Sequence, residues 1–225
     1  MSSIVNPVDP FAPFERHRVR IQQDPVTTAI LVTGTSDTMT VFGTASVFND
    51  TTGEYINYLS ASGAGNGFGV RATAFTNIRG NNSPVWSTVM KTGAAAGDIQ
   101  NMRVWCGICS ANPVGADAPG AISLAAFRYA PATDGTLFWR AVTSDGAAAT
   151  TTTTAQSIAA DTRYVLRIDW SVAARVDFYI NDTLFASHTT NLPAAATALG
   201  WVAEGSVTVS GTRNIRFRRT EFDQV

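Results

Sequence analysis

Residues 162–170 read TRYVLRIDW, and residues 175–188 read RVDFYINDTLFASH. Apolar side chains occupy every second position of both segments: Tyr164, Leu166 and Ile168, then Val176, Phe178 and Ile180. Alternation with a period of two is typical of strands that bury one face. Within the second segment, Asn181-Asp182 is typical of a tight hairpin turn between residues 175–180 and 183–188. The segment therefore predicts consecutive antiparallel strands.

The chain beyond about residue 26 follows the same pattern, with turn residues such as Thr133-Asp134-Gly135 between alternating segments. We expect strands at residues 28–33, 38–48, 54–60, 67–79, 85–90, 101–110, 121–129, 136–144, 162–170, 175–181, 183–188, 197–204 and 212–222. The threonine run 150–154 also suits a strand on a polar face. The Ala-rich stretches 92–97 and 191–198 are long enough only for a helical turn. About a dozen strands at this spacing indicate a sandwich or barrel.

The composition fits one all-β domain. Of the 225 residues, 45% are hydrophobic and 15% are charged, which excludes bulk disorder. The net charge is −1, so nothing draws the whole protein to nucleic acid or to an anionic membrane. No apolar run is long enough for a transmembrane helix, and no secretory signal pattern opens the chain, so we expect neither spanning nor conventional secretion.

The first 25 residues differ from the rest of the chain. They contain four of the nine prolines, set around Phe11 and Phe14, which indicates an extended arm. The arm continues into an alternating segment that places Arg16, Arg18 and Arg20 on one strand face. Two interpretations stay open. The segment is either an edge strand with a solvated charged side or an arm that adds to a neighbouring chain and offers arginine to its carboxylates.

The paired strands of residues 162–188 resemble those of the concanavalin A-like lectin and glucanase jelly roll, and Arg213 to Phe222 is similar to its closing strand. Residues 101–193 look like a stretch that recurs in structural proteins of tailed bacteriophages. The resemblance implies an all-β fold, a concanavalin A-like jelly-roll β-sandwich with an extended N-terminal arm. We expect an arm at residues 1–25 and a jelly-roll domain at residues 26–225.

The catalytic residues of the enzymes in this family do not carry over. The carboxylate pair Glu221 and Asp223 lacks the third acid of the glucanase strand, and Arg219-Thr220-Glu221 matches a lyase strand only at the very end of the chain. The metal-binding members use an acidic and Asn-rich cluster, whereas turn formation alone explains the aspartates here: Asp134, Asp145 and Asp182. We therefore expect no enzyme activity, no metal and no cofactor.

Two further residue types are assigned to the interior. Cys106 and Cys109 lie three positions apart in an alternating segment, so they point to opposite faces and predict structural thiols rather than a disulfide. The five tryptophans also lie in alternating segments, which favours the core or an interface: Trp86, Trp105, Trp139, Trp170 and Trp201.

The main functional hypothesis is a non-enzymatic structural protein of a phage particle, a capsid decoration or cement subunit on the virion surface, made in the bacterial host cytoplasm. Its partner-binding residues would be Phe11, Phe14, Arg16, Arg18 and Arg20, which contact the major capsid protein or other virion subunits. By analogy we expect a homotrimer. The alternative is a carbohydrate-binding, lectin-like receptor-binding module of a phage tail or fibre, in which a groove on one sheet carries Trp or Tyr with Asn and Asp around it.

Overall fold

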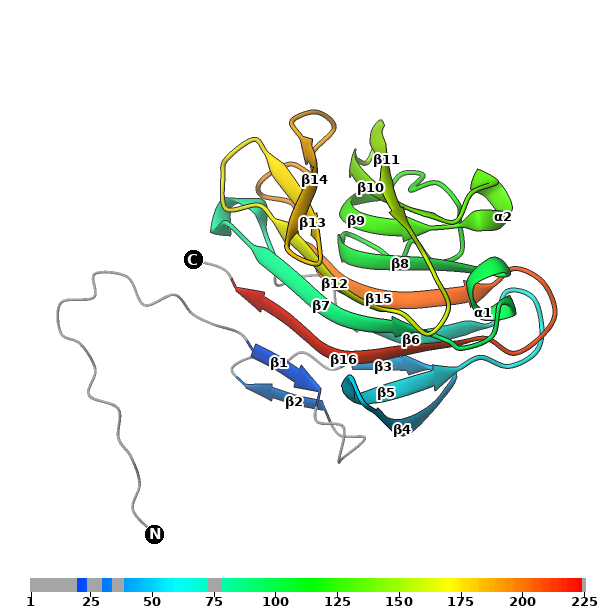
Figure 1. The fold of residues 1–225 in the computed structure, drawn as a ribbon. Helices are drawn as coiled ribbons and strands as arrows, with labels where there is room; N and C mark the ends of the chain where they lie inside the picture. The colour runs from blue at the N-terminus through cyan, green and yellow to red at the C-terminus, as the bar shows by residue number, and fades with distance from the viewer. Residues whose placement is uncertain (1–19, 24–29, 34–38, 73–77, 224–225) are drawn as a thin grey trace, which may run out of the picture.

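The computed structural model describes residues 20–23, 30–33, 39–72 and 78–223, with the backbone alone described at residues 20–23, 30–33, 39, 219 and 221–223. Its strands form two antiparallel seven-stranded sheets and one two-stranded hairpin (Figure 1). The fold is therefore an all-β jelly-roll sandwich, as the sequence predicts. None of the helices in these ranges is long and apolar enough to cross a membrane.

The first sheet has the strand order β11-β10-β9-β8-β15-β6-β3. Its strands, in chain order, are β3 (Met39–Phe42), β6 (Gly67–Ala72), β8 (Met102–Cys109), β9 (Ser123–Tyr129), β10 (Phe138–Asp145), β11 (Ala149–Ser157) and β15 (Gly200–Val207). Strand β15 lies inside this sheet, between β8 and β6.

The second sheet has the order β14-β13-β12-β7-β16-β5-β4. Its strands are β4 (Thr44–Asp50), β5 (Gly53–Leu59), β7 (Val85–Thr92), β12 (Arg163–Asp169), β13 (Val176–Ile180), β14 (Thr183–His188) and β16 (Asn214–Asp223). The hairpin of β1 (Arg20–Gln23) and β2 (Ile30–Thr33) lies beside β16 (Figure 1). The short helices are η1 (Gly80–Asn82), α1 (Gly97–Gln100) and α2 (Pro131–Asp134).

The consecutive strands β12, β13 and β14 form as the sequence predicts. Leu166 pairs with Ile180 and Ile168 with Phe178, so the alternating apolar side chains of β12 and β13 share the inner face. Asn181 and Asp182 both take positive φ angles, 50° and 63°, at the turn into β14. The Asn181 Oδ1 also accepts a hydrogen bond of 2.9 Å from the Val165 backbone N–H, which joins the turn to β12.

Aromatic side chains fill the space between the sheets. Phe127 of one sheet meets Phe178 of the other edge-on, with ring centroids 5.4 Å apart, and Trp139 packs against both Phe127 and Tyr164. A second, smaller cluster lies on the outer face of the first sheet, where Val114 of the loop after β8 covers Trp105. All five tryptophans are at most 3% exposed, which confirms the prediction of burial.

Both cysteines are buried free thiols, as predicted. Cys106 belongs to the core between the sheets and Cys109 to the outer cluster, so their side chains do point to opposite faces of β8. Burial raises the pKa of both thiols, which keeps them protonated and inert.

Several predicted boundaries are wrong in detail. The strand expected at 38–48 is two strands, because Gly43 takes a φ of 77° and sends β3 into one sheet and β4 into the other. The strand expected at 67–79 is described only to Ala72, and Ile78 then forms an isolated bridge with Leu199. Residues 92–97 end β7 and enter α1, while 191–198 form turns and no helix. The threonine run 150–154 lies in β11, as predicted.

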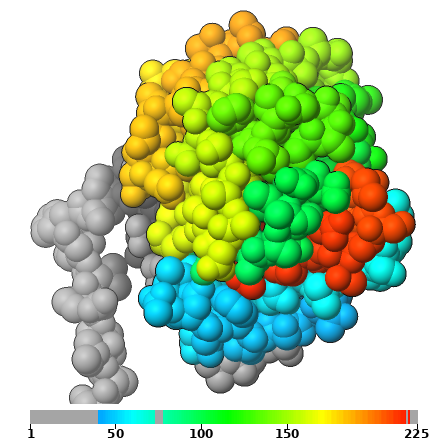
Figure 2. Space-filling model, turned by 45° about the vertical axis from the view of Figure 1, so that its right-hand side comes forward, coloured from blue at the N-terminus to red at the C-terminus, as the bar shows by residue number. Residues whose placement is uncertain are grey.

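The loops at one end of the sandwich are tied together. Residues 60–66 lie beside residues 207–213, which appear cyan and red-orange in Figure 2. Backbone hydrogen bonds of 2.9 Å from Ser60 to Arg213 and 2.6 Å from Gly211 to Ser62 join them. The two loops are therefore held together at this end of the sandwich.

Candidate functional site

A row of paired residues crosses the outer face of the first sheet. Phe42 of β3 lies opposite Gly69 of β6, Gly69 opposite Glu204 of β15, Glu204 opposite Trp105 of β8, and Trp105 opposite Arg128 of β9. Directly paired residues point to the same face of a sheet. The row thus places one carboxylate, Glu204, between a glycine and a tryptophan.

Two glycines of β6 leave this face open beside the carboxylate. A Cβ at Gly67 would lie 3.2 Å from Glu204 Oε1 and 3.6 Å from the Phe42 Cβ. Gly69 has a φ of 118°, and a Cβ there would lie 2.5 Å from the Ala203 carbonyl oxygen. A side chain at Gly67 would therefore fill the space between Phe42 and Glu204, whereas a side chain at Gly69 would collide with the backbone of β15.

The open space is a pocket of about 360 Å3, which we call the Glu204 pocket. Strands β3, β6, β8 and β15 form its floor, and the turn at residues 63–66 and the loop after β8 form its rim. The residues lining it are Phe42, Gly65, Gly67, Arg71, Arg103, Asn112, Val114, Gly115, Glu204 and Ser206.

Glu204 is the most deeply buried charged residue of the pocket, with 3% of its side chain exposed. Its Oε2 accepts a hydrogen bond of 3.2 Å from Arg71 Nη1. None of the described residues hydrogen-bonds to its Oε1. Burial raises the pKa of Glu204 to about 7, and the nearby Arg71 opposes that rise only in part. Glu204 is thus a carboxyl group with one unused acceptor at the floor of a pocket.

Arg71 is held on a second side as well. Its guanidinium lies over the Phe42 ring, 4.4 Å from the centroid, and its side chain is 23% exposed. Stacking on an aromatic ring together with an ion pair fixes the plane of a guanidinium. Arg71 therefore presents its remaining N–H donors to the pocket from a defined position.

The opposite wall is built from Arg103 and the loop that follows β8. Arg103 forms an ion pair with Asp117 and donates 3.3 Å and 3.4 Å hydrogen bonds to the Val114 carbonyl and the Ser206 hydroxyl. Asn112 Oδ1 accepts the Val114 N–H at 3.0 Å, which leaves the Asn112 amide group as a donor at the rim. The loop is anchored from below, because Trp105 Nε1 donates to the Ala116 carbonyl.

These groups form a balanced set for a neutral polar ligand. Two arginines face two carboxylates, Glu204 and Asp117, so the site carries little net charge when both acids are ionised. An acceptor at Glu204 and donors at Arg71 and Asn112 suit a ligand that has several adjacent hydroxyl groups. The Phe42 ring adds an apolar edge.

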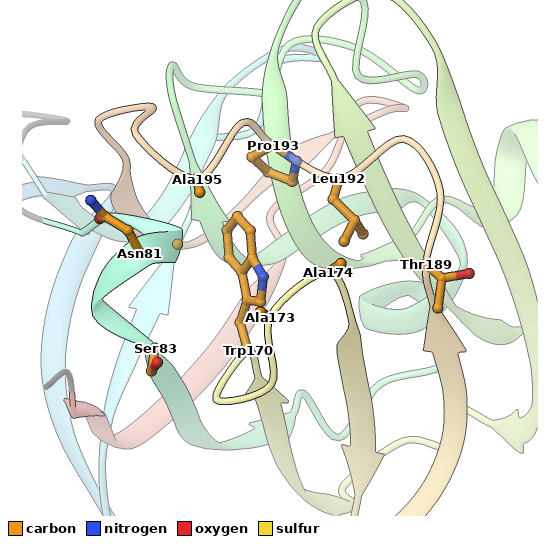
Figure 3. Close-up of a pocket in the computed structure, with 10 residues that line it drawn as sticks. Asn81, Ser83, Trp170, Ala173, Ala174, Thr189, Leu192, Pro193 and Ala195 are labelled. Atoms are coloured by element: carbon orange, nitrogen blue, oxygen red, sulfur yellow. The ribbon is translucent and has the colours of Figure 1, made fainter.

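A second pocket of about 510 Å3 lies beyond the opposite end of β15, and we call it the Trp170 pocket. It is enclosed by three loops, after Ile78, after Trp170 and after His188 (Figure 3). Trp170 forms one wall, and Asn81, Ser83 and Thr189 are its polar lining residues. None of the described residues that line it is charged.

The outer face of the second sheet carries a polar cluster of another kind. Lys91, 5% exposed, lies between Asp50 and Asp161, and Asp161 also pairs with Arg216 at 3.1 Å. Arg216 in turn lies over the Phe48 ring, 3.6 Å from the centroid. Every charge in the cluster is compensated within it, which indicates a structural ion-pair network rather than a ligand site.

The partner-binding residues predicted from the sequence lie mostly outside the described residues. This holds for Phe11, Phe14, Arg16 and Arg18, while Arg20 is described only as the first backbone position of β1. The predicted boundary between residues 25 and 26 also lies outside them. The arm and its contacts therefore stay predictions.

The aspartates assigned to turns have local partners. Asp145 accepts 2.8 Å hydrogen bonds from the backbone N–H groups of Ala147 and Ala148, as expected of a turn residue. Asp134 lies at the end of α2, and its carboxylate also forms ion pairs with Arg128 and Arg140. Within the described ranges, no three His, Cys, Asp or Glu residues are grouped so that they could hold a metal ion. Glu221 and Asp223 lie in β16, with only their backbone described.

Sequence reasoning missed both pockets. Glu204 is a lone carboxylate in the apolar and small-residue run Gly200–Val207, and that isolation was a usable signal of a special role. The partners Arg71, Arg103 and Asn112 come from three separate segments, which no local pattern links. The groove with Trp or Tyr on one sheet stays a prediction: among the described tryptophans, Trp105 is covered on the outer face of the first sheet and Trp170 lines a pocket between loops.

Comparisons with known proteins agree with the fold. No family model matches the sequence, and no curated protein matches it. Among solved structures, a botulinum neurotoxin type C structure, described as entering cells through interaction with two ganglioside molecules, is similar at 9% identity and a TM-score of 0.57, over 91% of this chain and 46% of that one.

Two further structures are similar to the same extent. A protein of unknown function from Shewanella oneidensis MR-1 has 12% identity and a TM-score of 0.57, over 92% of this chain and 84% of that one. The binding domain of Paraclostridial Mosquitocidal Protein 1 has 11% identity and a TM-score of 0.55, over 92% and 48%. The chain thus spans about half the length of the toxin structures. At these identities the similarity shows a shared β-sandwich fold alone.

Proposed function

We propose that this protein is a non-catalytic carbohydrate-binding module that holds sugar hydroxyl groups in the Glu204 pocket. The observation that carries the proposal is the unused Oε1 of Glu204, a 3% exposed carboxyl that opens on the pocket. A carboxylate beside an arginine and an amide can accept and donate to neighbouring hydroxyls at the same time. The ligand named for the botulinum neurotoxin type C structure contains sugars, which is in keeping with this class.

The absence of catalysis is part of the proposal. Hydrolysis of a glycosidic bond needs two carboxyl groups in one cleft, one of them free to act as base or nucleophile. Glu204 has the raised pKa of an acid, but Arg103 lowers the pKa of Asp117 and holds its carboxylate in an ion pair. The Glu204 pocket therefore offers a proton donor without a second free carboxylate.

The test is a glycan array followed by calorimetric titration of the best ligand. Glu204→Gln keeps the size of the side chain but removes the charged acceptor, and we expect at least a tenfold loss of affinity. Gly67→Ala places a methyl group near Oε1 without changing any charge, and it should weaken binding similarly. Glu54→Gln, at an exposed position of the other sheet, is the matched control.

Unchanged affinity in both pocket variants would overturn the proposal. Circular dichroism of each variant separates loss of binding from loss of fold. Release of reducing ends from a bound glycan by the wild-type protein, and not by Glu204→Gln, would overturn its non-catalytic part.

For the biological setting we propose the surface of a phage particle, with this module on a tail or fibre. The support is the resemblance of residues 101–193 to phage structural proteins, together with the Pro- and Arg-rich sequence of residues 1–25. A capsid decoration subunit that clamps neighbouring virion subunits, as a trimer, through Phe11, Phe14, Arg16, Arg18 and Arg20 is the second candidate.

Truncation of residues 1–25 distinguishes the two settings. A decoration subunit should lose binding to purified particles while keeping its fold, and sedimentation should show whether the full chain is trimeric. A receptor-binding module should keep glycan binding after the same truncation. Retained particle binding by the truncated chain would contradict the clamp.

A further inference from the structure

The Trp170 pocket lies well away from the Glu204 pocket. Ile78 and Leu199 form a bridge beside it, whereas Ser206 and Gly67 pair beside the Glu204 pocket, so the two pockets flank opposite ends of β15. The strand rises about 3.3 Å per residue, which separates Leu199 from Glu204 by roughly 17 Å. A ligand group in one pocket therefore does not contact the other.

The interior of the Trp170 pocket is apolar. Trp170 is 3% exposed, and a Cβ at Gly80 would lie 2.4 Å from its six-membered ring, so Gly80 is what allows the indole to sit this close to the backbone. Leu192 and Pro193 add apolar surface (Figure 3). Methyl-sized side chains at Ala173, Ala174 and Ala195 leave the volume open.

The polar groups of this pocket lie at its rim. The side chains of Asn81, Ser83 and Thr189 form no hydrogen bond with any described residue. In Figure 3 the amide of Asn81 and the hydroxyl of Thr189 point away from the Trp170 ring. The pocket thus combines an apolar interior with unused hydrogen-bonding groups around its mouth.

The loops around the pocket are fixed by backbone hydrogen bonds. The Asn81 N–H donates to the Ala195 carbonyl at 3.0 Å, which joins the first loop to the third. The Trp170 N–H donates to the Pro84 carbonyl at 2.9 Å, which joins the second loop to the first. A cavity bounded by tied loops is preformed, and a preformed site binds without a large ordering cost.

We propose that the Trp170 pocket receives the acetamido group of an N-acetylated hexose. The methyl group packs against Trp170 and Leu192, and the sugar ring stays at the mouth of the pocket, where its hydroxyls hydrogen-bond to the outward-pointing side chains of Asn81 and Thr189. The absence of charge on the lining residues disfavours carboxylate and ammonium groups, which would be desolvated without a counter-ion. The proposal rests on the proposed function in one respect: the ligand is a saccharide.

Saturation-transfer NMR with N-acetylglucosamine tests this assignment directly. In the wild-type protein we expect the N-acetyl methyl protons to receive the strongest saturation, with much weaker signals from glucose and glucosamine. Ala195→Phe fills the pocket from an exposed position and should reduce binding at least tenfold. Ala196→Phe adds the same ring at the next exposed position, outside the lining, and is the matched control.

The two pockets are separated in the same experiment. Glu204→Gln should keep the N-acetyl signal, whereas Ala195→Phe should keep any binding that depends on Glu204. Equal methyl saturation in wild type and Ala195→Phe, or equal binding of glucose and N-acetylglucosamine, would overturn the inference and leave the Glu204 proposal standing. If Ala195→Phe fails to fold, Gly80→Ala displaces Trp170 and gives a second test.

Discussion

Glu204 combines burial, a single arginine partner and a pKa raised to about 7 from an ordinary value of 4.5. The folded protein therefore takes up a proton at a higher pH than the unfolded chain does. The stability that this group contributes is fully present below pH 4.5 and is lost as the pH rises through about 7. Ionisation of Glu204 should therefore lower the free energy of unfolding at pH 8, relative to pH 4, by on the order of 3 kcal/mol.

We expect Glu204→Gln to remove this dependence. Its free energy of unfolding, relative to wild type, should increase by about 2–3 kcal/mol between pH 4 and pH 8, because the glutamine does not ionise. Urea denaturation at both pH values measures the difference. Parallel profiles for the two proteins would mean that Glu204 is solvated in the folded state.

His188 is also buried, and its effect on how stability depends on pH is opposite in sign to that of Glu204. Its Nδ1 lies 2.9 Å from Thr143 Oγ1 and its Nε2 lies 2.9 Å from Thr152 Oγ1, so the ring joins β14 of one sheet to β10 and β11 of the other. Burial lowers the pKa of His188 below its usual 6.5. The unfolded chain therefore takes up the proton first, and stability is lost as the pH falls below 6.5.

Acidification from pH 7 to pH 5 should thus destabilise the wild type more than His188→Leu. At pH 7 the same substitution should itself cost on the order of 1–3 kcal/mol, because two threonine hydroxyls lose their partner. Thr152→Val removes one hydrogen bond and keeps the titrating ring, so it should retain the pH dependence. Thermal unfolding at the two pH values gives both comparisons.

Among the elements, β6 depends most on glycine. Gly69 requires a φ of 118° where β6 pairs with β15, and a Cβ there would lie 2.5 Å from the Ala203 carbonyl. Gly65, in the turn before β6, also has a positive φ, 85°, but it has open space around it. Alanine substitutions at Gly65 and Gly69 therefore distinguish the cost of the positive φ angle from the cost of a steric collision.

Gly69→Ala should destabilise the protein by about 2–3 kcal/mol, and Gly65→Ala by about 1 kcal/mol. Chemical denaturation of the two variants checks the difference. Equal costs would mean that β6 shifts away from β15 to make room.

At the level of elements, the sequence predicted the strands far better than it predicted the break between β3 and β4 or the loops that form the pockets. Alternation identified β12 and β14 because each has buried positions and positions that are at least partly exposed, and it identified β13 although Asp177 on its polar side is also buried. It merged β3 with β4, because a sheet change at Gly43 leaves the alternation intact. It missed both pockets, because these depend on contacts between distant segments, such as Arg71 with Glu204 or Asn81 with Ala195.

The β-sandwich carries two candidate pockets near opposite ends of β15. The large aromatic core between the sheets links both ends, and nothing in the described contacts joins the Glu204 carboxyl to Trp170. Sites more than about 10 Å apart without shared partners usually act independently.

We therefore expect the effects of Glu204→Gln and Ala195→Phe on glycan affinity to add. The double variant should match the sum of the single losses in binding free energy to within about 0.5 kcal/mol. Calorimetric titration of an N-acetylated oligosaccharide into the wild type, the two single variants and the double variant completes this double-mutant cycle. A larger interaction term would mean that one glycan chain spans both pockets.

Gly67 has a consequence for how the Glu204 pocket can change. Gly67 lines the pocket and carries no side chain, so a substitution at this position makes the pocket smaller. Many single mutations can close the pocket, whereas enlarging it requires shortening Phe42 or reshaping the Asn112 rim. A lineage under selection to abandon its ligand would have a short mutational route, and one that broadens its specificity would be confined to the rim.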